Sequence, residues 1–202
     1  MKRLLGAAAA LLVVAIASSG PLSAQRPIDG ATYAASGELQ RPGNYREWVF
    51  LSSGLDMTYG PGAALATSNR PHLFNNVFVA PEAYRYFKAN GTWPDQTMFV
   101  LEIRRADEQV SINNGGRTQG DLLAIEAAVK DSARYRDTGG WAYFGLGMRA
   151  SAKAFPPTEE CYSCHRANTA VDNTFVQFYP ELFAIAKQKG TIKPTYDPNR
   201  KP

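Results

Sequence analysis

The chain has very few of the side chains that bind metals through sulfur or nitrogen. Its 202 residues include two cysteines, Cys161 and Cys164, and two histidines, His72 and His165. A structural zinc site needs four such ligands, and His72 lies far from the other three in the sequence. A thioredoxin-like redox pair would lie near a βαβ pattern in a reducing compartment, and neither condition holds. A small disulfide remains an alternative for the two cysteines.

Long apolar runs and blocks of like charge are also missing from most of the chain. After residue 24, no segment is long and apolar enough to cross a bilayer, so no stable membrane insertion is expected. The basic residues are scattered and form no stripe. The formal net charge of +4 falls to about +2 without the leader, which holds Lys2 and Arg3 but no acid. We therefore expect no nucleic-acid partner.

The first 24 residues have the pattern of a secretory signal peptide. A short basic start precedes an apolar run from Leu4 to Ala17, and small residues surround a cleavage point after Ala24. The apolar core is too short for a membrane span. The expected location of the mature protein is therefore the periplasm.

The mature chain is expected to form a single domain. Neither repeats nor long low-complexity segments divide it, and its length is sufficient for one hydrophobic core. We assign residues 25–192 to this domain and residues 193–202, which include three prolines, to a loose C-terminal tail.

The sequence Cys161-Tyr162-Ser163-Cys164-His165 is the attachment motif of a c-type haem. Two thiols three residues apart on a helical turn can each form a thioether with one haem vinyl group, and the adjacent histidine can then ligate the iron. Thr158, after two prolines, predicts a cap for this helix. Since c-type haem is ligated outside the bacterial cytoplasm, the motif and the signal peptide support each other. We expect one haem c, with His165 as the iron ligand.

The middle of the chain has the pattern of strands, whereas helices are expected near the motif, which predicts an α+β fold. In the expected strand 97–104, Phe99 and Leu101 share one face. Residues 122–131 fit either a helix or a strand, and residues 113–120 form a glycine-rich loop. Further strands are expected at 48–52, 73–80 and 141–148, and helices at 81–89 and 161–165. A closing helix is expected within 175–189, either after Pro180 or through it.

Five further segments occur in a characteristic order around these elements: Asn44–Val49, Val77–Tyr84, Glu126–Ser132, Gly140–Tyr143 and Thr174–Pro180. Together with the haem motif, they resemble the cytochrome P-460 and cytochrome c-prime-beta family over nearly the whole mature chain. The resemblance implies a dimeric, mainly antiparallel β-sheet fold with a few flanking helices. It also implies a five-coordinate iron, with histidine on one side and an open site on the other.

The resemblance implies two alternative chemistries. Cytochromes P-460 oxidise hydroxylamine with a lysine bonded to the porphyrin rim, and local matching places that lysine at Leu101, which has no nitrogen to form the bond. Cytochromes c-prime-beta lack the cross-link and bind nitric oxide or carbon monoxide in an apolar pocket. Phe99 and Leu101 would form such a pocket here. A distal arginine of the family is replaced near Asn75. Asp131 matches a family acid that assists proton removal, with a surface role as the alternative.

We therefore expect a periplasmic mono-haem protein that binds small gases at an apolar distal site. One alternative is an oxidoreductase of the cytochrome P-460 type, acting on hydroxylamine or nitric oxide, and Leu101 argues against this enzyme activity. The other is an electron-transfer cytochrome c, which would need a sixth ligand from among His72, Met57, Met98 and Met148. The expected partners are a gaseous or nitrogen-oxide ligand, a redox-partner cytochrome and a second copy of the chain.

Overall fold

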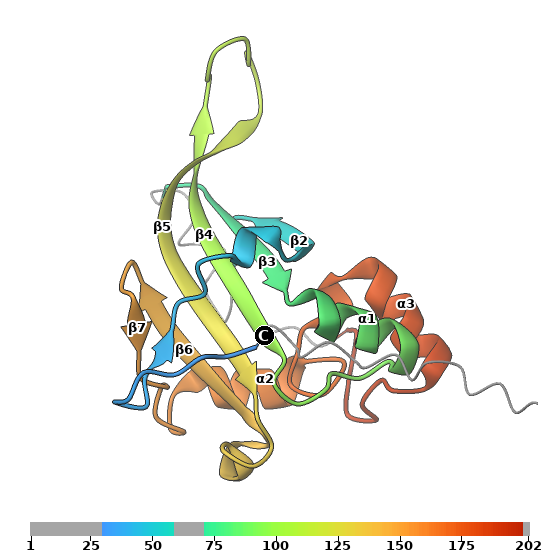
Figure 1. Cartoon of the computed structure of the whole chain (residues 1–202). Helices are drawn as coiled ribbons and strands as arrows, with labels where there is room; N and C mark the ends of the chain where they lie inside the picture. Colours follow the sequence, from blue (N-terminus) through green and yellow to red (C-terminus); the bar gives the residue numbers. More distant parts are fainter. Residues whose placement is uncertain (1–29, 59–70, 200–202) are drawn as a thin grey trace, which may run out of the picture.

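The computed structural model describes residues 30–58 and 71–199, so the signal peptide predicted at residues 1–24 lies outside the described residues. The central element is a five-stranded antiparallel sheet (Figure 1). Its strands, in the order in which they pair, are β2 (Val49–Leu55), β3 (Leu73–Val79), β4 (Met98–Glu108), β5 (Arg117–Lys130) and β6 (Trp141–Gly147).

The remaining elements flank this sheet. A second, two-stranded sheet joins β1 (Leu39–Gln40) to β7 (Ser151–Ala152). The helices are α1 (Pro81–Asn90), α2 (Glu160–Asn168) and α3 (Pro180–Lys189), and the short 3-10 turns are η1 (Tyr45–Glu47), η3 (Arg136–Thr138) and η4 (Val176–Phe178). The predicted α+β fold with a mainly antiparallel sheet is confirmed. None of the helices in the described ranges is long and apolar enough to cross a membrane.

Side-chain alternation along β4 gives the sheet two different faces. Met98, Val100 and Glu102 are almost completely buried on one face. Glu102 contacts Tyr45 of η1, which lies in front of the sheet in Figure 1. Phe99 and Leu101 point to the opposite face and line a cavity. The face sharing predicted for Phe99 and Leu101 is thus confirmed.

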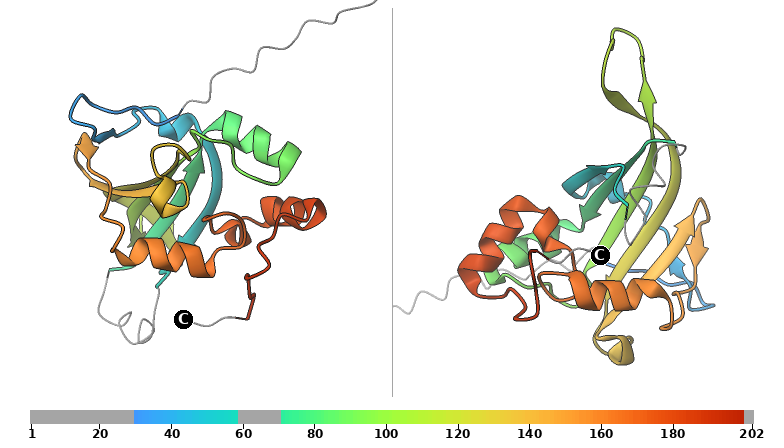
Figure 2. Two further views of the ribbon diagram at one scale, coloured as in Figure 1. Left: turned by 90° about the horizontal axis from the view of Figure 1, so that it is seen from below. Right: turned by 180° about the vertical axis from the view of Figure 1, so that it is seen from behind.

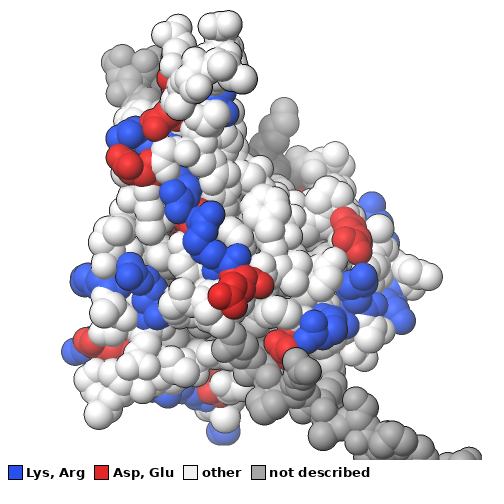
Figure 3. Space-filling model, turned by 45° about the horizontal axis from the view of Figure 1, so that its top comes forward, with Lys and Arg blue, Asp and Glu red and all other residues white. Residues whose placement is uncertain are grey.

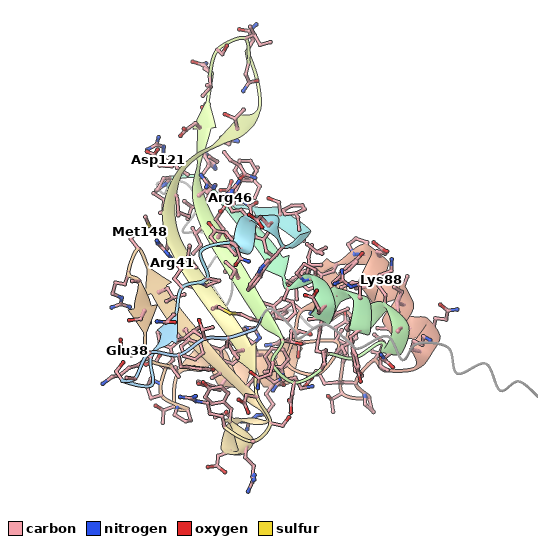
Figure 4. All side chains as sticks on the ribbon, in the orientation of Figure 1. Glu38, Arg41, Arg46, Lys88, Asp121 and Met148 are labelled. Carbon is pink, nitrogen blue, oxygen red and sulfur yellow. The ribbon has the colours of Figure 1, made fainter. Side chains whose placement is uncertain are left out.

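A buried carboxylate attaches η1 to the front face. The side chain of Glu102 has no exposed surface and accepts hydrogen bonds from Tyr45 Oη at 2.6 Å, Arg46 Nη1 at 2.5 Å, Asn76 Nδ2 at 3.1 Å and Arg104 Nε at 2.5 Å. Burial alone would raise the pKa of Glu102, but these hydrogen bonds outweigh it and lower that pKa to about 2. Figure 4 shows Arg46 approaching the sheet from η1.

The segment 122–131, which the sequence left open between helix and strand, lies almost entirely within β5. Ala128 pairs with Phe99, and Glu126 pairs with Leu101. The glycine-rich loop predicted at 113–120 is shorter than expected because β5 begins at Arg117. The β4–β5 hairpin extends well beyond the rest of the sheet (Figure 1). On the face of the molecule shown in Figure 3, Lys and Arg side chains are interspersed with Asp and Glu.

The structure settles the start of the closing helix and corrects one predicted cap. The sequence left open whether the helix in 175–189 starts at Pro180 or runs through it. The structure has η4 followed by α3, which begins at Pro180 because proline suits the first turn of a helix but interrupts its interior. The N-cap of α2 is Glu159, and no side chain caps it, so the cap predicted at Thr158 is wrong. Pro81 begins α1 as predicted, and Gly91 ends it with a φ of 75°.

Candidate haem site

A cavity of about 900 Å³ lies between the back face of the sheet and the C-terminal third of the chain. Figure 2 shows α2 crossing the sheet on this side. Side chains from all five strands of the larger sheet line one wall, and α2 with the segment after it lines the other. The volume lies within the range of cofactor pockets, about 300–1,000 Å³.

The helix α2 brings the haem motif to this cavity. Cys161, Cys164 and His165 all line it. Both cysteines are free thiols and partly exposed, so neither is engaged in a disulfide. Burial raises the pKa of the Cys161 thiol, which keeps it protonated at neutral pH.

His165 is held in one orientation by its surroundings. Its Nδ1 lies 2.8 Å from the carbonyl oxygen of Asn173. Because a carbonyl can only accept, Nδ1 carries the proton and Nε2 keeps its lone pair. The rings of Tyr143 and Phe175 lie 4.3 and 4.6 Å from the imidazole. Burial lowers the pKa of His165, which favours the neutral form that ligates metals.

The sheet wall is mainly apolar near its centre. Leu101 on β4 lies between its pairing partners Val77 on β3 and Glu126 on β5, and all three line the cavity. Phe99 and Ala128 form the next apolar pair along the same strands. The structure therefore places both residues predicted for the distal side, Phe99 and Leu101, in the cavity wall.

Glu126 is the cavity residue that sequence reasoning missed. Its side chain is exposed to the cavity, and it makes no hydrogen bond or ion pair with another described residue. The surrounding protein nevertheless removes enough solvent to raise the pKa of its carboxyl group. Its negative charge also contributes to the raised pKa of Cys161. The alternation of β5 would have revealed Glu126, had residues 122–131 been assigned to a strand.

Asp131, in contrast, is not brought to the cavity. It follows the end of β5, where its Oδ1 accepts hydrogen bonds from the backbone N–H groups of Ala133 and Arg134, and its Oδ2 accepts one from Gln96. The backbone hydrogen bond from Arg134 is the main cause of its lowered pKa. These contacts stabilise a turn, so the acid next to Leu101 is Glu126.

The other residues considered as a sixth iron ligand do not lie together in the structure. His72 Nδ1 lies 2.5 Å from Asp56 Oδ2, and His72 is not among the cavity-lining residues. Met98 is buried on the front face, and Met148 is exposed, as Figure 4 also shows for Met148. Met57 does line the cavity, and so does Asn75.

The tail that the sequence predicts to be loose makes specific contacts over its described part. Lys193 donates hydrogen bonds to Thr169 Oγ1 at 2.8 Å and to the carbonyl of Arg166 at 2.9 Å. Tyr196 packs edge-to-face on Phe183 of α3 at 5.9 Å and also lines the cavity. Asp197 and Pro198 line the cavity as well, so the described part of the tail belongs to its wall.

The donor set of the cavity fits a c-type haem: two free thiols three residues apart, a neutral imidazole with a free Nε2, and an apolar wall. A family model described as Cytochrome P460 matches residues 42–176. The chain belongs to the cytochrome P460 family. This membership makes it a haem protein of the c type and implies haem c as its cofactor, and the family is periplasmic. None of the curated proteins compared with the chain matches it.

Proposed function

We propose that this cytochrome P460 family member binds nitric oxide or carbon monoxide. In this proposal Cys161 and Cys164 form thioethers with haem, His165 ligates the iron through Nε2, and the iron supplies a vacant position for the gas. The observation that carries the proposal is Leu101. It lines the cavity at the position where the family resemblance places a cross-linking lysine, and it has no nucleophilic atom.

The cavity wall favours small neutral ligands for a physical reason. A neutral diatomic molecule loses little solvation when it moves against Phe99, Leu101, Val77 and Ala128. Bound dioxygen develops negative charge and is stabilised by a hydrogen-bond donor, which these four side chains do not offer. Nitric oxide and carbon monoxide need no such donor.

Absorption spectra of the purified protein test this proposal in its oxidised, reduced and nitric-oxide-treated reduced forms. We expect a high-spin spectrum that changes on addition of nitric oxide, and an intact mass equal to that of the mature chain plus thioether-bound haem. A low-spin spectrum would instead indicate an electron-transfer cytochrome, with Met57 as the candidate sixth ligand. A further loss of about two hydrogens, with a red-shifted reduced band, would indicate a porphyrin cross-link. A colourless protein from a host that matures c-type cytochromes would rule out haem attachment.

A second candidate function, oxidation of hydroxylamine, is favoured by Glu126. A carboxylate in the cavity with a raised pKa is suited to accept protons from a bound substrate. Turnover of hydroxylamine with an electron acceptor tests this function. If Glu126 acts as the base, Glu126→Gln should lower the rate about 100-fold or more, whereas the matched change Glu160→Gln, also on the cavity lining, should have little effect.

We further propose that the protein is exported by residues 1–24, acts in the periplasm as a homodimer and exchanges electrons with a partner cytochrome. The family resemblance supports dimerisation. Light scattering coupled to size-exclusion chromatography measures the mass of the assembly, and a mass of one chain would contradict the dimer.

A further inference from the structure

The carbonyl that orients His165 belongs to a tight turn. Val171 and Thr174 form an isolated antiparallel bridge, and the N–H of Thr174 donates to the carbonyl of Val171 at 2.9 Å. Asp172 and Asn173 are the two central residues of this turn. The carbonyl of Asn173 accepts from His165 Nδ1 at 2.8 Å and from Tyr143 Oη at 3.4 Å. The position of this turn therefore decides how the imidazole is held.

Asp172 has a backbone conformation that rarely suits a side chain. Its φ is 55°, in the left-handed region where glycine is favoured. A non-glycine residue keeps such a conformation only when its surroundings hold it there. The adjacent residue is Asn173, so any relaxation of Asp172 moves the carbonyl that His165 uses.

Two side chains from the sheet hold Asp172. Lys130 at the end of β5 donates to Asp172 Oδ2 at 2.6 Å, and its Nζ also donates to the carbonyl of Trp93 at 2.8 Å. Trp141, the fully buried first residue of β6, donates through Nε1 to Asp172 Oδ1 at 3.0 Å. The Lys130 and Asp172 side chains are only 17% and 23% exposed, so solvent screens this pair weakly.

We propose that Lys130, Asp172 and Trp141 act together as positioning residues, which we call the proximal clamp. The clamp holds the Asn173 carbonyl against His165 Nδ1. It thereby sets how strongly His165 donates electrons to the iron. The proposal rests on the proposed ligation of iron by His165. A strong hydrogen bond at Nδ1 makes the imidazole a better electron donor through Nε2. With haem bound, the clamp would thus stabilise the oxidised state of the iron through His165.

Three substitutions in the haem-loaded protein test the clamp. Trp141→Phe removes one donor without changing charge, Lys130→Met removes the cation, and Asp172→Asn removes the anion. We expect all three to lower the iron–histidine stretching frequency in the resonance Raman spectrum of the reduced protein. Trp141→Phe should also shift the redox equilibrium about tenfold toward the reduced form, a rise of about 59 mV.

Because Lys130 and Asp172 carry opposite charges, their variants distinguish positioning of the His165 ring from a direct electrostatic effect on the iron. If the pair acted only through its charges, Lys130→Met and Asp172→Asn would shift the reduction potential in opposite directions and leave the stretching frequency unchanged. That result would overturn the proposal, as would an unchanged frequency in Trp141→Phe. Folding is checked by circular dichroism. The comparison of potentials needs both charge variants folded, whereas the stretching frequency of any one folded variant already tests the clamp.

Lys88→Met is the matched control. Lys88 lies on α1, away from α2 (Figure 4), in an exposed pair with Glu181 at 3.6 Å. This variant should keep the wild-type frequency and potential. The Raman frequency can be measured whether or not the protein binds nitric oxide. Failure of gas binding would therefore contradict the proposed function alone, and an unchanged frequency would contradict the clamp alone.

Discussion

At the scale of single residues, two neighbouring side chains determine which ligands the cavity favours. Leu101 and Glu126 pair across β4 and β5, and both face the cavity. One is apolar and the other is ionisable with a raised pKa. Leu101 favours uncharged gases, whereas Glu126 would assist proton transfer. Changing each one separately therefore distinguishes the two candidate functions.

Adding a hydrogen-bond donor at Leu101 should change the gas preference. We expect Leu101→Gln to raise the dioxygen affinity of the reduced protein about tenfold, because one hydrogen bond contributes about 1.4 kcal/mol. Carbon monoxide affinity should change little. Flash photolysis gives both affinities. Leu101→Met keeps the apolar character and similar volume, so an equal effect of the two substitutions would contradict this prediction.

At the scale of elements, the buried Glu102 attaches η1 to the sheet, and this attachment should be sensitive to acid. Glu102 has a folded-state pKa of about 2, below its ordinary value of 4.5. Its contribution to stability is therefore present above pH 4.5 and is lost as the pH falls toward 2. The loss amounts to about 3 kcal/mol.

Urea unfolding at pH 5 and near pH 2 measures this loss. We expect Glu102→Gln to be less stable than the wild type at pH 5 and to lose less stability on acidification. Glu82→Gln alters an exposed pair with Arg85 and should retain the wild-type fall. A wild-type fall in Glu102→Gln would mean that other carboxyl groups cause the acid sensitivity.

The junction between α1 and α3 depends on Gly91. Its φ is 75°, and a Cβ there would lie 2.8 Å from both Lys189 Cβ and Thr191 Oγ1. We expect Gly91→Ala to lower the free energy of unfolding by about 2 kcal/mol. Gly116 has a similar φ with no neighbour within 4 Å, and its change to Ala should cost about 1 kcal/mol. Gly43 has open space and an ordinary φ, and its change to Ala should stay within about 0.5 kcal/mol.

These elements also show what sequence alone could predict. Pro81 and the alternation in 97–104 identified α1 and β4, because both signals are local. Residues 122–131 carry alanine and glutamate, which favour a helix, yet they form a strand because pairing with β4 and β6 on both sides overrides the local preference. That ambiguity concealed Glu126, since only a strand assignment places it on the same face as Leu101.

At the scale of the whole molecule, the haem motif lies on a helix that contributes little to the hydrophobic core. The sheet and front face contain most of the buried residues, whereas α2 buries only Tyr162. The motif was readable from sequence because its spacing is fixed by haem chemistry. The clamp was not, because Lys130 and Asp172 are 42 positions apart and meet only in the fold.

Haem should therefore stabilise α2 and the segment after it more than the sheet. We expect hydrogen exchange in α2 and residues 173–198 to be at least about tenfold slower in the haem-loaded protein than in Cys161→Ser/Cys164→Ser. Exchange in β3, β4 and β5 should differ much less. Mass spectrometry of deuterated peptides measures both regions, and an equal effect on α2 and on the strands would contradict this prediction.

The position of α2 in the chain has a consequence for biogenesis. Every strand of the larger sheet precedes Cys161 along the polypeptide, and chains emerge from the ribosome amino end first. The sheet wall of the cavity can thus form before the segment that carries the two thiols emerges. In the proposed haem protein, thioether formation at Cys161 and Cys164 would then follow the pairing of the sheet.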